Sequence, residues 1–561
     1  MRQLWFNRPA RVRIGAVIGG LLLAAVATTV PPAGAVQTGG DPLVVRTADG
    51  LLRGKSVGTT DEYLGIPYAA APVGPLRWQP PSPAAHWSGV REATAFAPNC
   101  AQPASPFGRA STSEDCLYLN VYAPSGANLR GRTLPVMVWI HGGALITGES
   151  NDYDPAALVR DGVVVVTMNY RLGALGFLAD SALTQSPDSP DSPASPDSPD
   201  SPDSSDSPSG ASGDYGLMDQ QAAMRWVRSN VGRFGGDAQN VTLFGESAGG
   251  LSVLSQLVSP GARGLFDRAI VESGTYNLVQ DSSATAEASG QAFATKVGCA
   301  AAAAGATPPA QVAACLRALP VRTVLDNEDS AGYRPNVDGF VLPESLQSAF
   351  ASGRFAQVPV LIGTNHDEST LFVAEDELKG EAVTPADYRA MISATLGVSV
   401  QAAAAIAAQY PVGSYASPAL ALSAVDTDVT FACTALAAEE SLSKYVPTYA
   451  YEFNDKNAPQ QYLPSAGFPF GAAHTVEVQY LFALTAPLPG SLTAGQQQLA
   501  TDMRSYWTGI AKDGHPSRFW QTYWPRFHSD AQLTMSLETP DTRVETDFAA
   551  QHHCGFWSAA A

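Results

Sequence analysis

The sequence predicts an α/β fold built on one large, mostly parallel sheet that carries helices on both faces. Short and almost wholly apolar runs recur along the chain, and helix-like, Ala-rich stretches lie between many of them. Strands that are apolar on both sides are typical of parallel sheets covered by helices on both faces. The runs that we interpret as such strands are residues 134–140, 241–244, 268–273, 358–364 and 447–453. Residues 43–53 instead predict a short antiparallel hairpin near the N-terminus.

The first 35 residues have the features of an export signal. Four arginines precede an uncharged run from Ile14 to Val30, and Ala33-Gly34-Ala35 is a small-residue cleavage pattern. A membrane anchor is the alternative, but the apolar run is short, contains glycines and leads into the cleavage pattern. We therefore expect residues 1–35 to be removed. The product is a secreted protein with one domain, residues 36–561, and no stable membrane association.

A Ser-Pro-Asp repeat at residues 186–210 departs from its surroundings. It holds almost no apolar side chains, and its prolines block helices and sheet ladders, so we expect a disordered, solvated insertion. The flanking residues read as continuous fold, with a β-branched run before the repeat and helical spacing after it. Weak calcium binding by the aspartates is an alternative, but a repeat of this kind offers no converging oxygens.

The net charge and composition of the chain restrict the kinds of molecule that it is expected to bind. The formal charge is −19, and loss of the four leader arginines lowers it to −23. A negative field of this size repels phosphates, which argues against nucleic acid and anionic membranes as partners. The chain is 45% hydrophobic and 15% charged, so it can bury a large core.

The six cysteines indicate disulfides rather than a metal site, because their number is even, none lies in a CxxC pair and the chain is expected to be exported. Spacing favours two local loops, Cys100–Cys116 and Cys299–Cys315. The remaining pair is Cys433–Cys554, which would tie the end of the chain to its body. No metal and no cofactor are expected.

A candidate nucleophile lies in the segment VTLFGESAGG, residues 241–250. Ser247 stands in a G-x-S-x-G pattern at the end of a predicted strand, and the following segment, AGGLSVLSQLV, predicts a helix. This strand–turn–helix context is the one that a strained nucleophile turn requires, since neighbouring backbone leaves room only for glycine on both sides. The alternative is a serine in an ordinary turn.

A serine nucleophile needs a base and an acid that orients the base. In folds with this turn the chain order is serine, acid, histidine. His474 is attractive because it lies in a Gly- and Ala-rich loop before an apolar stretch, but spacing alone does not select it. Asp367 and Glu368 both follow the strand at 358–364, and spacing leaves both open. The histidines after Ser247 are His366, His474, His515, His528, His552 and His553.

A candidate oxyanion hole follows the strand at 134–140. His141-Gly142-Gly143-Ala144 fits a loop whose backbone N–H groups face a tetrahedral intermediate, since small residues let a substrate oxygen approach the peptide plane. A simple glycine turn is the alternative.

Taken together, these motifs resemble the type-B carboxylesterases, the α/β-hydrolase family that includes bacterial para-nitrobenzyl esterases and cholinesterases. EDCLYLNVYAP (114–124) and FGGDAQNVTLFGESAG (234–249) are similar to the long signatures of that family. Further stretches match in order, among them NVDGFVLP, VLIGTNHDES, WTGIAKDGHP and HHCGFW. The resemblance covers about residues 40–557 and implies the α/β-hydrolase fold.

The resemblance also implies roles for single residues. Ser247 becomes the nucleophile, His474 the base, and Glu368 the acid, because Glu368 fills the glutamate position of a G-x-N-x-x-E motif. The oxyanion donors become the N–H groups of Gly143, Ala144 and Ala248, with Gly142 shaping the loop. The disulfides expected from spacing are similar to those of the cholinesterase branch.

Several residues depart from the family pattern. Ser369 and Thr475 replace glycines that usually follow the acid and the histidine, and Ala144 replaces a frequent third glycine. The loop between Cys100 and Cys116 is short and lacks tryptophan, so an aromatic platform for quaternary ammonium groups is missing. Choline esters are therefore not expected to be preferred.

The expected function is hydrolysis of small-molecule carboxylic esters through a Ser-His-Glu triad and an acyl-enzyme. One alternative is a long-chain lipase, although no extended apolar helix suggests a lid. Another is a non-catalytic, cholinesterase-like binding protein, although such relatives typically lose a triad residue and this chain keeps all three. Acyl preference, physiological substrate and oligomeric state do not follow from the sequence.

Overall fold

We analysed a computed structural model of the 561-residue chain. It describes residues 41–129, 131, 133–184, 212–301, 307–329, 333–485, 488 and 490–560. The leader at 1–35 and the Ser-Pro-Asp repeat at 186–210 lie outside the described residues, so the predictions for them stay predictions. The residues from Pro42 onward form one unit, which is described below.

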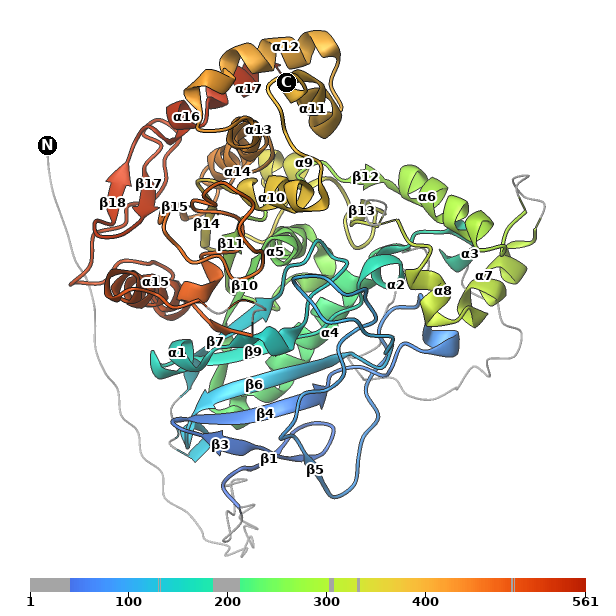
Figure 1. The fold of residues 1–561 in the computed structure, drawn as a ribbon. Coiled ribbons are helices and arrows are strands. Elements are labelled where there is room, and N and C mark those ends of the chain that lie inside the picture. The colour runs from blue at the N-terminus through green and yellow to red at the C-terminus, as the bar shows by residue number, and fades with distance from the viewer. Residues whose placement is uncertain are drawn as a thin grey trace, which may run out of the picture. The chain divides into compact units, whose positions relative to one another are not determined.

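An eleven-stranded sheet runs through this unit (Figure 1). Its seven neighbouring strands from β9 to β17 are parallel, and the strands at both ends are antiparallel. The predicted fold class, a mostly parallel sheet, is confirmed. In spatial order the strands are β18 (Arg543–Glu545), β17 (Thr534–Leu537), β15 (Thr448–Phe453), β14 (Val360–Asn365), β11 (Arg268–Glu272), β10 (Gly236–Glu246), β7 (Leu134–Ile140), β9 (Val164–Met168), β6 (Tyr118–Pro124), β4 (Thr60–Pro67) and β3 (Lys55–Val57).

Short sheets lie beside the large one. The predicted N-terminal hairpin is confirmed as β1 paired antiparallel with β2, and β5 extends it. The small sheets comprise β1 (Val44–Arg46), β2 (Leu51–Arg53) and β5 (Val90–Glu92); β8 (Tyr153–Asp154) and β16 (Ala483–Leu484); and β12 (Asp281–Ser282) and β13 (Asn336–Val337).

Helices cover both faces of the large sheet, and the alternation within β7 shows this directly. Val136 and Val138 point into one hydrophobic core, which also contains side chains of α4 and α5. Met137 and Trp139 point into the opposite core, which contains side chains of α15. A strand flanked by two cores must be apolar throughout, which is why the 134–140 run shows no polar alternation.

Helices and strands alternate along much of the chain. The longest are α4, which was expected from its helical spacing, and α15, which begins with a capping box formed by Thr493 and Gln496. The helices are α1 (Ala156–Arg160), α2 (Gly173–Phe177), α3 (Ser181–Thr184), α4 (Tyr215–Asn230), α5 (Ala248–Val258), α6 (Ser283–Lys296), α7 (Pro309–Ala318), α8 (Val321–Leu325), α9 (Leu346–Ser352), α10 (Thr370–Lys379), α11 (Tyr388–Leu396), α12 (Val400–Gln409), α13 (Pro418–Asp426), α14 (Cys433–Leu442), α15 (Ala494–Asp513), α16 (Phe548–Gln551) and α17 (Cys554–Ala560).

A π-helix, η7 (Thr427–Ala432), joins α13 to α14. Within the described ranges, the resulting stretch Pro418–Leu442 is the one helix long and apolar enough to cross a membrane, but 61% of its most apolar window is buried inside the protein. Burial of this extent is typical of a core helix.

All three predicted disulfides are confirmed: Cys100–Cys116, Cys299–Cys315 and Cys433–Cys554. The last bridge closes a separation of 121 residues and fastens α17 to the start of α14.

Candidate active site

The turn between β10 and α5 holds Ser247 in a strained conformation. Its φ of 55° and ψ of −121° lie outside the regions that non-glycine residues favour. Its backbone N–H donates to the carbonyl oxygen of Glu272 on the neighbouring strand β11 at 2.8 Å. The strain therefore persists because strand pairing on one side and a helix start on the other fix the turn.

The two glycines that flank Ser247 are required by close backbone contacts. A Cβ atom on Gly249 would lie 1.9 Å from the carbonyl oxygen of Ile140, at the end of β7. A Cβ atom on Gly245 would lie 2.7 Å from that same oxygen. Only glycine fits at either place, which is the reason for the G-x-S-x-G pattern.

His474 lies on the loop after β15 and reaches Ser247 across 227 residues of sequence. Its Nε2 is 2.8 Å from Ser247 Oγ, and its Nδ1 is 2.5 Å from Glu368 Oε2. The imidazole is buried, and the rings of Phe372 and Phe431 lie 5.1 and 5.2 Å from it. The ring is thus held by apolar contacts while both nitrogens face polar partners.

Glu368 is fixed from the other side by the end of β14. Its Oε1 accepts hydrogen bonds from Thr364 Oγ1 at 2.7 Å and from the backbone N–H of Asn365 at 2.8 Å. Asp367, which spacing left as an alternative, faces His366 at 2.9 Å and the N–H of Ala472 at 2.9 Å. The structure therefore brings Glu368, and not Asp367, to the imidazole of His474.

The loop after β7 lies beside Ser247. Gly143 and Ala144 have positive φ angles of 101° and 56°, and their N–H groups have no hydrogen-bond partner among the described residues. A Cβ atom on Gly143 would lie 2.1 Å from the carbonyl oxygen of Thr147, so glycine is needed there. Ala248 begins α5, where helix N–H groups lack intrahelical acceptors. Gly142 packs against Ser247, where an added Cβ would be 3.0 Å from Cβ of Ser247.

Gly143, Ala144, Ser247 and His474 line one cavity of about 810 Å³. Its walls are mostly apolar and include Leu145, Ile146, Leu251, Leu371 and Phe431. Besides Ser247 and His474, the charged residues Arg334, Glu375, Lys379 and Asp426 also line it. A cavity of this size and lining accepts a small organic molecule.

Sequence reasoning missed a group of buried carboxyl groups behind His474. Glu246 Oε1 lies 3.3 Å from His474 Nε2, and Glu246 is paired in register with Glu272 on β11. Burial, followed by the nearby charges of Glu368 and Glu272, raises the pKa of Glu246 well above its usual range. Burial raises the pKa of Glu272 to about 8 and that of Glu477 well above normal. Burial therefore disfavours the charged form of all three groups, which limits the negative charge around the imidazole. The available signal was a charged residue, Glu246, at the end of an apolar strand.

Two departures from the family pattern have visible consequences. Thr475 has a φ of 74°, a conformation that suits the glycine usually found there and is strained for a β-branched residue. Ser369 is buried at the start of α10, and its backbone N–H donates to Thr427 Oγ1 at 3.0 Å. Both side chains are accommodated without displacing the imidazole from Ser247 or Glu368.

Comparison with known proteins agrees with this geometry. The sequence profile of the carboxylesterase family matches residues 41–187 and 204–557. The chain is 34% identical to a fumonisin B1 esterase of Sphingopyxis macrogoltabida over 90% of this chain and 88% of the relative. It is 32% identical to a para-nitrobenzyl esterase of Bacillus subtilis (strain 168), over 90% and 96% of the two chains. It is 31% identical to a human cocaine esterase, over 98% and 96%. The chain therefore belongs to the carboxylesterase family and is a carboxylic ester hydrolase.

Proposed function

We propose that the protein is a secreted serine carboxylesterase whose triad is Ser247, His474 and Glu368. The observation that carries the proposal is the single imidazole of His474, whose two nitrogens lie 2.8 Å from the serine hydroxyl and 2.5 Å from a buried carboxylate. Such a chain of contacts is the arrangement that activates a hydroxyl for attack on a carbonyl.

In the first step Ser247 Oγ attacks the carbonyl carbon of the ester and passes its proton to His474 Nε2. The developing oxyanion accepts hydrogen bonds from the N–H groups of Gly143, Ala144 and Ala248. Glu368 stabilises the imidazolium that forms. When the tetrahedral intermediate collapses, the ester C–O bond breaks, and the alcohol leaves with the proton from His474.

In the second step a water molecule attacks the acyl-enzyme and His474 accepts one of its protons. The carboxylic acid then leaves and the proton returns to Ser247. Burial disfavours charge on Glu246, Glu272 and Glu477, and Glu368 is the carboxyl group in contact with Nδ1 of the imidazole.

Secretion is the second part of the proposal. Its support is the set of three disulfides, which persist in oxidising compartments, together with the leader features of residues 1–35. Sequencing the N-terminus of protein from culture medium tests it, and we expect a start near Val36.

Activity is tested on purified mature protein with p-nitrophenyl esters of graded acyl length. We expect turnover that is lost in Ser247→Ala by several orders of magnitude in kcat. Preference for short chains fits an esterase, whereas preference for long, aggregated chains would indicate a lipase. No turnover of any ester by folded wild-type protein would indicate a binding protein and overturn the proposal.

A further inference from the structure

Another buried histidine, His552, lies next to the disulfide at the end of the chain. Its Nδ1 is 2.6 Å from Asp428 Oδ1 and its Nε2 is 2.5 Å from Glu452 Oε1. The His552 side chain is 3% exposed, so water does not compete for these contacts. Both ring nitrogens face carboxyl oxygens, and when both carboxyl groups are ionised both nitrogens donate and the ring is an imidazolium.

The pKa shifts of His552 and Glu452 agree with a charged imidazolium. Burial alone would lower the pKa of His552, but attraction to Glu452 and hydrogen bonds to Asp428 and Glu452 raise it to about 10. Burial would raise the pKa of Glu452, but attraction to His552 lowers it to about 2. The carboxyl group of Glu545, on β18, also lies against Glu452.

Asp428, one partner of His552, is connected to Glu368, the acid of the proposed triad, through η7. Asp428 belongs to this π-helix, and its neighbour Thr427 accepts the backbone N–H of Ser369 at 3.0 Å. Ser369 directly follows Glu368. Phe431, in the same π-helix, has its ring 5.2 Å from the ring of His474. η7 thus contacts both the acid loop and the catalytic imidazole.

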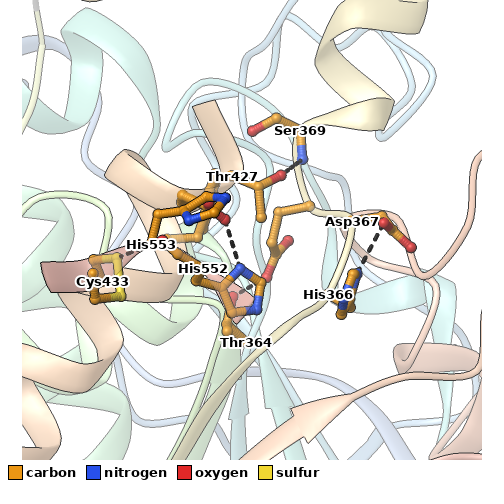
Figure 2. Close-up of polar contacts among 12 residues, drawn as sticks. Thr364, His366, Asp367, Ser369, Thr427, Cys433, His552 and His553 are labelled. Atoms are coloured by element: carbon orange, nitrogen blue, oxygen red, sulfur yellow. Dashed lines mark hydrogen bonds and ion pairs between the residues drawn. A yellow bond between two sulfur atoms is a disulfide. The ribbon is translucent and has the colours of Figure 1, made fainter. Parts of the chain in front are cut away.

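Glu452, the other partner of His552, is connected to the loop that carries Glu368 through the pairing of β15 with β14. Glu452 is on β15, which pairs in parallel with β14, the strand that ends at the acid loop. The N–H of His366 donates to the carbonyl oxygen of Phe453 at 3.0 Å, and the His366 ring lies 5.3 Å from that of His552. Figure 2 shows His552, His366 on the neighbouring loop, and the hydrogen bond between Ser369 and Thr427.

A bound cation is the other interpretation of this cluster. One ligand atom each from His366, Glu452 and His552 lie within 4.8 Å of one another. However, the 2.5 Å between His552 Nε2 and Glu452 Oε1 is shorter than the roughly 3.3 Å that separates two ligands of a tetrahedral zinc with bonds of about 2.0 Å. The spacing suits a shared proton rather than a metal ion.

We propose that His552 is a positioning residue of the esterase, which clamps η7 to β15 and thereby holds the Glu368 loop and the His474 ring in register with Ser247. The proposal rests on the triad proposed above. Because Cys433–Cys554 fastens the chain two residues beyond His552, loss of the imidazolium removes the clamp without releasing the C-terminus.

The test compares His552→Gln with His553→Asn and the wild type. His553 is the adjacent histidine, it contacts Gln409 rather than a carboxylate, and asparagine tolerates its φ of 50°. For His552→Gln we expect kcat to fall about 10- to 100-fold, since small misplacements of catalytic groups cost this much. We expect KM to stay within about threefold, because no residue that lines the cavity is substituted. The rate of Ser247 labelling by a fluorophosphonate should fall in parallel with kcat. His553→Asn should keep wild-type kcat.

A folded His552→Gln protein with kcat within twofold of wild type would overturn the proposal. Stoichiometric zinc in the wild-type protein, with activity lost to EDTA and restored by zinc, would also overturn it in favour of the cation. If His552→Gln does not fold, Glu452→Gln, which keeps side-chain volume, should show the same kcat loss. Failure of both variants to fold would show that the cluster serves folding alone. A wild-type protein without esterase activity would instead contradict the proposed function.

Discussion

The variant Glu368→Gln removes the negative charge of the proposed triad acid but keeps the size and shape of its side chain. In the wild type, Oε2 accepts the N–H of His474 Nδ1 at 2.5 Å, which leaves Nε2 free to accept the proton of Ser247. In Glu368→Gln the amide oxygen is retained on the side of Thr364 and the N–H of Asn365, which both donate to Oε1. The amide NH₂ then faces Nδ1 and forces it to accept.

The imidazole proton therefore moves to Nε2, where it blocks acceptance from the serine. Loss of the correct tautomer in a triad costs about 10⁴ in kcat, or about 5.4 kcal/mol of activation free energy. Stopped-flow and steady-state hydrolysis of p-nitrophenyl acetate measure this loss, and circular dichroism checks that the fold is kept. Asp367→Asn is the matched control, because Asp367 contacts His366 and Ala472 and not His474. A Glu368→Gln enzyme that keeps more than a tenth of wild-type kcat would refute the reasoning.

Three further expectations follow from the same structure. Gly143→Ala should lower kcat by about 10²–10³, as for loss of one oxyanion donor. The reason is that the added Cβ would lie 2.1 Å from the carbonyl oxygen of Thr147, so the loop must shift. An unchanged kcat at unchanged Tm would contradict this expectation. Removing the Cys433–Cys554 bridge with a double serine variant should cost about 2–5 kcal/mol in urea unfolding, and an unchanged midpoint would show that the 121-residue loop contributes nothing. The pKa of Glu272 rises from 4.5 to about 8 on folding, so the folded state holds a proton that the unfolded state releases, and the stability from this group is lost as pH rises from 4.5 to 8. Glu272→Gln should therefore flatten the dependence of Tm on pH across that range, whereas parallel wild-type and variant curves would contradict the assignment.

The strands of the sheet could be predicted from the sequence because burial on both faces makes them continuously apolar. The 134–140 run coincides with β7, and the 268–273 run overlaps β11. β10 begins earlier than predicted, at Gly236, because its first half is polar and only partly buried. A strand that leaves the core loses the apolar signal although its backbone pairing continues.

Spacing could nominate the parts of the site but could not choose among them. Asp367 and Glu368 are adjacent in the chain, and their hydrogen-bond partners distinguish them: Thr364 and the N–H of Asn365 hold Glu368, whereas the N–H of Ala472 holds Asp367. The resemblance to carboxylesterases selected Glu368, and the structure shows the contacts behind that choice.

The contacts of the clamp around His552 could not be predicted from the sequence, although His552 itself lies in the family-like stretch HHCGFW. Its members, Asp428, Glu452 and His552, lie on a π-helix, a strand and a C-terminal turn, separated by up to 124 residues. Each would be interpreted alone as an ordinary polar residue, because long-range ion pairs have no local periodicity.

The most direct test of the account is covalent labelling of the nucleophile. Purified protein is treated with a fluorophosphonate and digested, and the modified residue is identified by mass spectrometry alongside ester hydrolysis by Ser247→Ala. We expect one label, on Ser247, with hydrolysis lost in proportion to labelling and absent from the alanine variant. A label on another serine, or hydrolysis by Ser247→Ala at the wild-type rate, would contradict the triad.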